Sequence, residues 1–213
     1  SNHHESHKFK NYSLSDLLNF KTYVIGGMGF DSSDYEYLKN SQNRRITNIN
    51  TVKKIHNSYQ HMKKNYYRYL NTLRLALKDD DWFGGATLHL APENLDVSLF
   101  SIRTAFRLFD FQTNLDYLKL KPNLHSILEI GGGYGKSLYD WMSIYNIHTA
   151  YYVDLPVNIA AAALYYKRRC DKNINFVIEK DDKIEEGVVN FVVPWRLFSI
   201  REVDLVINFN SLH

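Results

Sequence analysis

The fold is decided by the stretch Glu129-Ile130-Gly131-Gly132-Gly133-Tyr134-Gly135. A short apolar run over 126–130 leads into it, and the following segment, 136–145, carries apolar residues at helical spacing. The predicted order is therefore strand, glycine turn and helix. Glycines are needed at such a turn because the backbone must reverse sharply and come close to a ligand, which a Cβ atom would obstruct.

Three classes of ligand compete for this turn. A dinucleotide site needs G-x-G-x-x-G, which fails because the sixth position counted from Gly131 is Lys136. A phosphate-binding P-loop needs G-x-x-x-x-G-K-[ST], and its first glycine would have to stand where Ile130 does. A shift of one residue would misdirect the amides that ring a phosphate, so nucleotide triphosphate hydrolysis is disfavoured. The run does satisfy E-x-G-x-G-x-G.

Beyond Pro122 short apolar runs alternate with helical ones, which indicates parallel β-α-β units. Three further strands are predicted at 149–153, 175–178 and 203–209. A β-α-β unit takes ~30 residues, so the segment 121–213 can hold about four strands. The predicted strand order, 3-2-1-4, would leave the edge beside the fourth strand uncovered and open to a second copy of the chain.

The N-terminal part, residues 1–120, is predicted to be helical. Apolar residues at alternating three- and four-residue spacings predict a long helix over 51–78, and a second helical stretch is predicted over 96–118 with Asp96 as its N-cap. Residues 1–10 are polar and rich in histidine and are expected to be disordered. The basic residues of 51–78 form either a solvated face, the more common case, or a face for nucleic acid, and the apolar stripe could pair with a second chain.

Composition narrows the function classes. The formal net charge of +3 is too small to imply a polyanionic partner by itself. Cys170 is the sole cysteine of the 213 residues, so neither an intrachain disulfide nor a multi-cysteine zinc site can form, and a reducing compartment fits best. Because no apolar stretch approaches the ~18 residues of a membrane span, we expect a cytoplasmic protein without membrane association.

An acidic residue stands at a characteristic distance from the glycine turn. Asp154 ends the second predicted strand, 19 residues after Gly135. Together with E-x-G-x-G-x-G, this arrangement resembles the class I S-adenosylmethionine-dependent methyltransferases, whose folds place such an acid on the ribose hydroxyls. More particularly, the chain is similar to a bacterial family of sugar O-methyltransferases in I-L-E-I-G-G-G-Y-G at 127–135, Y-Y-V-D-L-P at 151–156, V-P-W-R-L at 193–197 and N-F-N-S-L-H at 208–213.

The resemblance implies a Rossmann-like methyltransferase sheet, S-adenosylmethionine as cofactor and a sugar or glycan hydroxyl as acceptor. Gly131, Gly133 and Gly135 would let the backbone approach the methionine moiety. Glu129 would receive the ammonium group of the cofactor, and Asp154 would hold its ribose. For both Glu129 and Asp154 a structural alternative stays open, because a carboxylate at the end of a strand can instead cap the helix that follows it.

Further site residues are expected near the ends of the later strands. One of the acids after the third strand, Glu179, Asp181 or Asp182, would bond the adenine amino group, with Asp181 as the candidate. Asn208 would lie near the transferable methyl. His213 is the candidate base that removes the proton of the acceptor hydroxyl, a task that histidine performs near neutral pH. Trp195 and Arg196 could stack on a sugar and hydrogen-bond it. No metal is expected.

The full sheet of such methyltransferases has more strands than the segment 121–213 can hold. We therefore expect a partial cofactor-binding domain, truncated after about four strands. Two other functions stay open. An RNA methyltransferase that uses the basic helix 51–78 would bind RNA with strong dependence on salt. A non-catalytic helical interaction protein with a vestigial cofactor fold would have no affinity for the cofactor.

Overall fold

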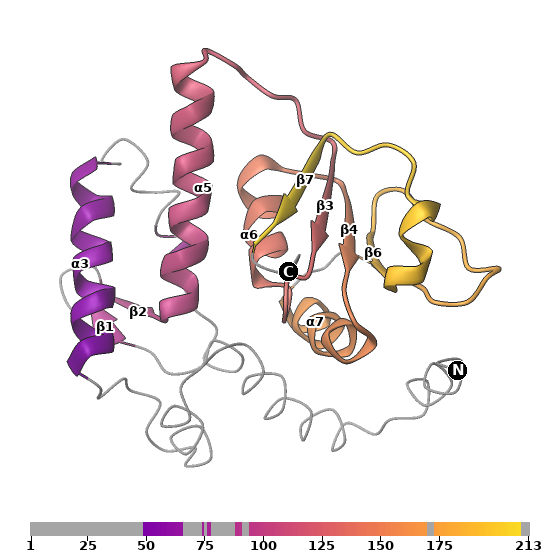
Figure 1. The fold of residues 1–213 in the computed structure, drawn as a ribbon, viewed down its shortest axis with the longest axis horizontal. Helices are drawn as coiled ribbons and strands as arrows, with labels where there is room; N and C mark the ends of the chain where they lie inside the picture. Colours follow the sequence, from indigo (N-terminus) through magenta and orange to yellow (C-terminus); the bar gives the residue numbers. More distant parts are fainter. Residues whose placement is uncertain are drawn as a thin grey trace. The chain divides into compact units, whose positions relative to one another are not determined.

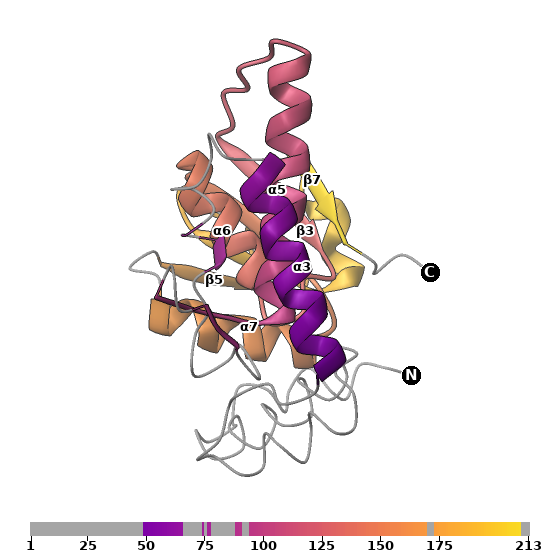
Figure 2. The same cartoon turned by 90° about the vertical axis from the view of Figure 1, so that its left-hand side faces the viewer.

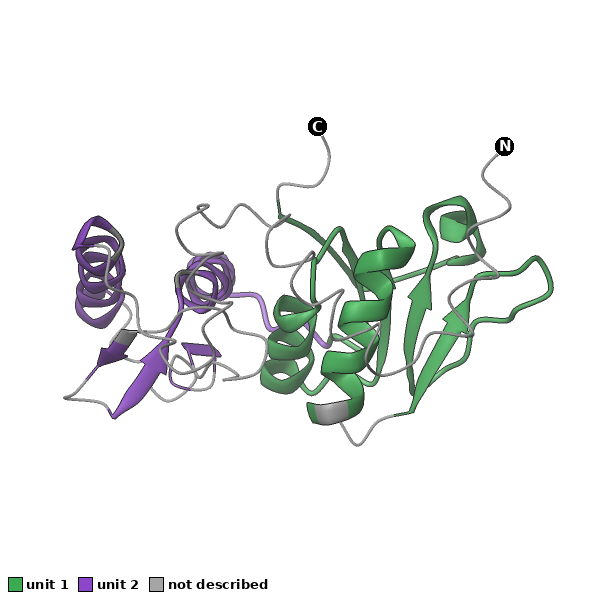
Figure 3. Ribbon diagram, turned by 90° about the horizontal axis from the view of Figure 1, so that it is seen from below, with its two compact units in different colours: residues 1–29, 124–213 green, residues 30–123 purple. Residues whose placement is uncertain are grey.

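The chain forms two compact units, and within the described residues the boundary between them falls between Asn123 and Leu124 (Figure 3). Sequence reasoning set the boundary at 121. We refer to them as the N-terminal unit and the sheet unit. The computed structural model describes residues 49–65, 74, 76–77, 88–90, 94–169 and 173–209.

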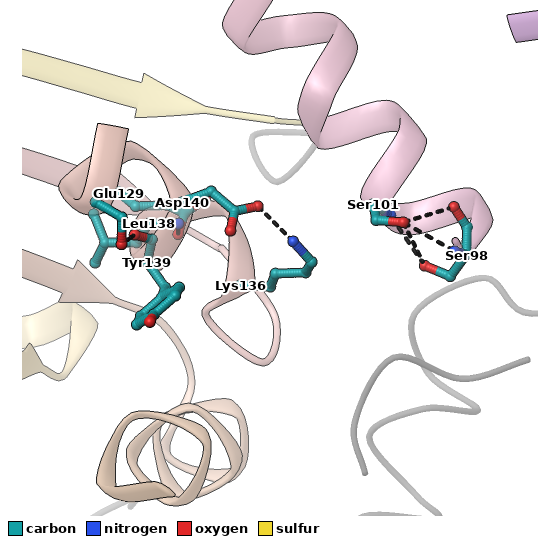
Figure 4. A network of polar contacts seen from close by, with 8 residues as sticks. Ser98, Ser101, Glu129, Lys136, Leu138, Tyr139 and Asp140 are labelled. Atoms are coloured by element: carbon teal, nitrogen blue, oxygen red, sulfur yellow. Dashed lines mark hydrogen bonds and ion pairs between the residues drawn. The ribbon is translucent and has the colours of Figure 1, made fainter. Parts of the chain in front are cut away.

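The N-terminal unit is not all helical. It contains helices α3 (Ile49–Asn65) and α5 (Leu99–Tyr117), and between them the antiparallel strands β1 (Leu88–Leu90) and β2 (Leu95–Val97). The predicted N-cap of the second helix is therefore wrong, because Asp96 lies within β2. The cap is Ser98, whose hydroxyl accepts from the Ser101 amide at 3.0 Å while the Ser101 hydroxyl accepts from the Ser98 amide at 2.9 Å (Figure 4).

Helix α3 has the two faces that the sequence predicts. Ile55, Tyr59 and Met62 are buried. Lys53, Lys54, Lys63 and Lys64 are exposed. The predicted helix extended to residue 78; within 66–78 only positions 74, 76 and 77 are described, and these are helical.

The sheet unit is an α/β layer structure with five parallel strands in the order β5-β6-β4-β3-β7 (Figures 1 and 2). This architecture is compatible with a Rossmann-like fold. Three predicted elements, the strands at 126–130 and 149–153 and the helix at 136–145, are confirmed at their predicted bounds. In chain order the unit consists of β3 (Ser126–Ile130), α6 (Lys136–Tyr145), β4 (Thr149–Val153), α7 (Pro156–Arg169), β5 (Ile174–Val177), β6 (Val189–Val192), the 3-10 helix η4 (Pro194–Ser199) and β7 (Leu205–Asn208).

The described sheet has one strand more than predicted, and the predicted order was wrong. β6 lies between β4 and β5. The signal was present, because residues 188–193 are apolar except for Asn190, as is typical of a strand buried on both faces. Asn190 is itself fully buried, and its side chain is satisfied there by the backbone of Glu185. Its Oδ1 accepts from the Glu185 amide at 3.0 Å, and its Nδ2 donates to the Glu185 carbonyl at 2.8 Å.

The two faces of the sheet are covered differently. On one face Tyr152 of β4 packs edge-on against Phe191 of β6, and Tyr166 of α7 packs on the same ring. Helix α6 joins this layer through Tyr139, which contacts the Tyr166 ring. On the other face Leu197 and Ile200 pack against the cluster of Leu128, Tyr151, Val153, Val177 and Val192. The crossover from β6 to β7 therefore covers the second face with η4 in place of an α-helix.

Candidate functional site

The glycine turn lies where the strand order reverses. The chain leaves β3 for β4 on one side, continues outward to β5 and β6, and returns to β7 on the other side of β3. Open parallel sheets bind ligands at the carboxyl ends of the strands at such a switch point, because the connections on either side diverge there. Residues 131–135 follow the carboxyl end of β3, so the turn occupies this position.

Glycine is required in the turn for two reasons. Gly131, Gly133 and Gly135 have φ angles of 72°, 64° and 85°, in the left-handed region that other residues enter only at a cost. Gly132 is required for space, since a Cβ atom there would lie 2.2 Å from Oε2 of Glu129. The sequence therefore specifies both the conformation and the close packing of this turn.

Glu129 lies beneath the turn, with 1% of its surface exposed. Its Oε2 accepts from the amide of Leu138 in the first turn of α6 at 3.1 Å (Figure 4). A buried carboxylate needs such donors, because one left unpaired is strongly unfavourable. This contact is the helix-capping role that the sequence left open. A direct contact between Glu129 and a ligand ammonium group stays a prediction.

Asp154 follows β4 and turns its carboxylate toward the glycine turn. Its Oδ1 accepts from the Leu155 amide at 2.7 Å and from the Asn158 side chain at 2.9 Å, which anchors it to the start of α7. Its Oδ2 accepts from the Gly133 amide at 3.2 Å and lies 2.9 Å from the Tyr152 hydroxyl. A carboxylate offers about four lone-pair positions, so protein donors already surround this one.

Tyr152 joins the acid to the turn. Its ring is fully buried, and its hydroxyl lies between the Asp154 carboxylate and the carbonyl of Gly133. Burial, reinforced by the negative charges of Asp154 and Glu129, raises the pKa of the phenol well above its usual value of 10.0. The hydroxyl therefore remains protonated at neutral pH. Because a phenol has one proton and both neighbours are acceptors, it donates to one of them at a time.

Sequence reasoning missed Tyr152 and Asn158. A signal existed for Tyr152, because side chains two residues apart on a strand share a face, and Tyr152 stands two residues before Asp154. Asn158 stands four residues after Asp154, near enough to reach back across the start of α7.

The structure brings Asn208 beside the turn but not Asp181. Asn208 is paired with Ile130 across β7 and β3, and its side-chain amide donates to the Ile130 carbonyl at 3.3 Å. Asp181 is exposed after β5, and two strands, β6 and β4, separate β5 from β3. Its predicted contact with adenine stays a prediction that the strand order does not favour. The candidate base His213 lies outside the described residues.

A buried ion pair begins helix α6. The Lys136 ammonium lies 2.6 Å from the Asp140 carboxylate, and the two side chains are 1% and 5% exposed (Figure 4). Their four-residue spacing on a helix is the sequence signal that was overlooked. Because Asp140 engages this ammonium, Lys136 is not presented to a ligand phosphate as the lysine of a P-loop would be.

A cavity of about 220 Å³ lies elsewhere, between α7 and β5. None of the cofactor-binding or catalytic residues predicted from the sequence lines it. Its lining is almost wholly apolar and does not supply the polar groups that orient a nucleoside, so we place the candidate site at the glycine turn. The lining residues are Pro156, Ile159, Ala160, Ala163, Leu164, Lys167, Ile174, Phe176, Ile178 and Val193.

Among the residues that the structure describes, no group of three or more histidine, cysteine, aspartate or glutamate side chains is placed to hold a metal ion. None of the helices in the described part of the chain has the length and apolar content to cross a membrane. In comparisons with known proteins, the chain matches no family model, no curated protein and no solved structure.

Proposed function

We propose that the sheet unit binds S-adenosylmethionine at the glycine turn and that it belongs to an enzyme which transfers the methyl group to a hydroxyl of a sugar or glycan precursor. One observation carries the proposal. At the switch point of a parallel sheet, a turn with three left-handed glycines meets an acid, Asp154, whose carboxylate is directed into that turn. A nucleoside with a ribose is the ligand class that uses both features.

The residues fit the cofactor if one protein contact gives way. Ribose hydroxyls need acceptor positions on Asp154, which protein donors hold. The bond from the Gly133 amide is 3.2 Å long, the longest of the four contacts of this carboxylate. The ribose replaces this bond, while Leu155 and Asn158 keep the carboxylate oriented.

The bound cofactor supplies an electrophilic methyl group, and the chain holds it in place. Gly131 and Gly133 allow the backbone to approach the methionine moiety. Glu129 contributes through the turn that it supports, because it is buried and tied to α6. Asn208 lies at the neighbouring strand end, on the side from which an acceptor would approach the methyl group.

The acceptor class rests on the family resemblance and on one surface feature. Trp195, in η4, is 54% exposed and offers an aromatic face of the kind that stacks on sugar rings. RNA is a second candidate, favoured by the four exposed lysines of α3. The two are separated by measuring RNA affinity at increasing salt, because counterion release makes binding to nucleic acid fall steeply.

Thermal denaturation of the whole chain with S-adenosylhomocysteine tests cofactor binding. A ligand at 100 times its dissociation constant adds about 2.7 kcal/mol to stability. Gly133→Ala should lose this stabilisation, because it strains the backbone beside Asp154. Gly187→Ala is the matched control: its φ is also left-handed, at 74°, and an added Cβ meets no atom within 4 Å. It should keep the stabilisation. A chain that gains none at saturating ligand contradicts the proposal.

A further inference from the structure

We infer that Tyr152 is a positioning residue that makes the site select ligands by their ribose hydroxyls. The inference rests on the proposed function, since it assigns Tyr152 to the same site. Tyr152 is fully buried, so it does not touch the ligand itself. It acts through the two groups at its hydroxyl, the Asp154 carboxylate and the Gly133 carbonyl.

The geometry makes Tyr152 the link between strand and turn. Asp154 Oδ2 is bonded to the Gly133 amide at 3.2 Å, and the phenol oxygen lies 2.9 Å from the same Oδ2 and contacts the carbonyl of the same glycine. The hydroxyl is thus in contact with both the acid and the turn. When a ribose displaces the Gly133 amide, the phenol remains as the contact that keeps the turn at a fixed position relative to Asp154.

The phenol proton also has two acceptors to choose between. While Asp154 lacks a ligand, the proton can serve the carboxylate. When a ribose hydroxyl donates to Asp154, the proton can serve the Gly133 carbonyl instead, so the phenol stays bonded to the turn after the Gly133 amide has been displaced. This exchange lets the turn stay anchored in both situations, which the ring alone cannot achieve because it carries no proton donor.

The substitution Tyr152→Phe removes the hydroxyl and keeps the ring, including its edge-on contact with Phe191. The matched control is Tyr166→Phe. Tyr166 is also fully buried and packs on the same Phe191, but its hydroxyl contacts the Met142 sulfur at 3.8 Å, whereas the Tyr152 hydroxyl contacts Asp154. Both variants therefore lose a phenolic hydroxyl and keep a ring that packs on Phe191.

The experiment measures the affinity of the whole chain for S-adenosylhomocysteine and for its 2′,3′-dideoxyribose analogue by calorimetry. Hydrogen bonds to a charged group are worth about 1.5–3 kcal/mol, so the unmodified chain should prefer the ribose ligand about 10- to 100-fold. Tyr152→Phe should reduce this ratio to about 3 or less, because the glycine turn loses the phenol contact that fixes its position relative to Asp154. Tyr166→Phe should leave the ratio unchanged.

The outcomes separate the inference from the proposed function. If S-adenosylhomocysteine does not bind to the unmodified chain, the proposed function fails and the inference fails with it. If it binds and Tyr152→Phe weakens both ligands equally, the ratio survives, Tyr152 is merely structural and only the inference is overturned.

A second measurement serves if Tyr152→Phe does not fold. This measurement is the NMR spectrum of the unmodified chain labelled with carbon-13 at the tyrosine ζ carbon. The ribose ligand should shift the resonance of one tyrosine that stays protonated at high pH, and it should do so much more than the dideoxyribose analogue does. Equal shifts of every tyrosine resonance with both ligands overturn the inference.

Discussion

The inner and outer halves of the sheet use polar side chains in opposite ways. In the inner half, β3 and β4, the carboxylates of Glu129 and Asp154 stand at the carboxyl ends of the strands and accept from backbone amides of the following turn and helices. In the outer half, β5 and β6, the side-chain amides of Asn175 and Asn190 lie within the strands and bind the loop 178–188.

The difference indicates where a ligand can act. The amides of the outer half pair with one another and with backbone groups, so this network serves the fold. The inner half gathers negatively charged acceptors and left-handed glycines at one sheet edge, where a ligand donor can compete for Asp154. Stability should therefore depend most on the outer network, and ligand affinity on the inner one.

The largest expected effect on stability is at Asn190. Asn190→Ala removes the hydrogen bonds of both backbone groups of Glu185 and one of the two hydrogen bonds of the Asn175 side chain, which keeps the Lys183 carbonyl. We expect the free energy of unfolding to fall by about 3 kcal/mol, since three hydrogen bonds of a fully buried amide are lost and each contributes about 1 kcal/mol. Urea denaturation measures the loss. The stabilisation by S-adenosylhomocysteine should remain. If it disappears, the outer half also governs ligand binding, and the proposed difference between the two halves is wrong.

The next effect is expected in the glycine turn. In Gly132→Ala the new Cβ would lie 2.2 Å from Glu129 Oε2 and 2.8 Å from the Tyr152 ring, so both must move. We expect a loss of about 2 kcal/mol in stability, as for other overpacked sites, together with loss of ligand binding. Gly187→Ala should cost about 1 kcal/mol, for its left-handed backbone alone. Equal effects of the two substitutions on ligand binding would show that the turn is not a site.

A pH-dependent effect is expected at the opposite, amino-terminal edge of the sheet. Asp204 Oδ2 accepts from the amides of His125 and Ser126 at 2.8 and 2.7 Å and from the Ser126 hydroxyl at 3.0 Å, which ties β7 to the start of β3. These bonds lower the pKa of Asp204, led by the one from the Ser126 amide. The ionised carboxylate is therefore favoured in the folded chain.

The sign of the pH effect follows from the direction of that shift. The stability that Asp204 contributes is fully present above the unfolded pKa of about 3.8 and is lost as pH falls through the lower, folded pKa. Thermal melts of the unmodified chain and of Asp204→Asn should differ at pH 6 and converge as the pH falls through the folded pKa of the carboxyl. A difference that stays constant across this range would assign no role to the charge of Asp204.

The smallest effect is expected at Asp181. Because this residue is exposed and two strands lie between β5 and β3, Asp181→Asn should change the affinity for S-adenosylhomocysteine by less than about twofold. Asp154→Asn should weaken it by at least tenfold, in line with the loss of a charged acceptor. A reversed ranking in the same calorimetric titration would restore Asp181 as a cofactor contact and would move the site toward the outer half.

The inner half was predictable because its signals are local. The glycine pattern, the apolar runs and the acid at Asp154 together located β3, α6 and β4, and the period of two would also have revealed Tyr152. The strand order of the outer half was not predictable, although a strand was expected at 175–178, because the position of β6 between β4 and β5 depends on contacts between distant residues. Asn190 shows why: its amide is satisfied by Glu185 and Asn175 only once the loop 178–188 has folded over it.

The roles of the carboxylates were only partly predictable for a similar reason. An acid at the end of a strand is suited to a ligand donor and equally to the first amides of the next helix. Sequence spacing does not separate these roles for Glu129 and Asp154, and the hydrogen bonds do: Glu129 is tied to α6, whereas Asp154 also reaches the turn.

Hydrogen–deuterium exchange of the whole chain, with and without S-adenosylhomocysteine, tests the central claim most directly. We predict that the ligand slows exchange in peptides that cover 131–135 and 154–158 and leaves the loop 178–188 unchanged. Slowing confined to 178–188, or no change at a concentration that saturates the chain, would contradict the assignment of the glycine turn as the cofactor site.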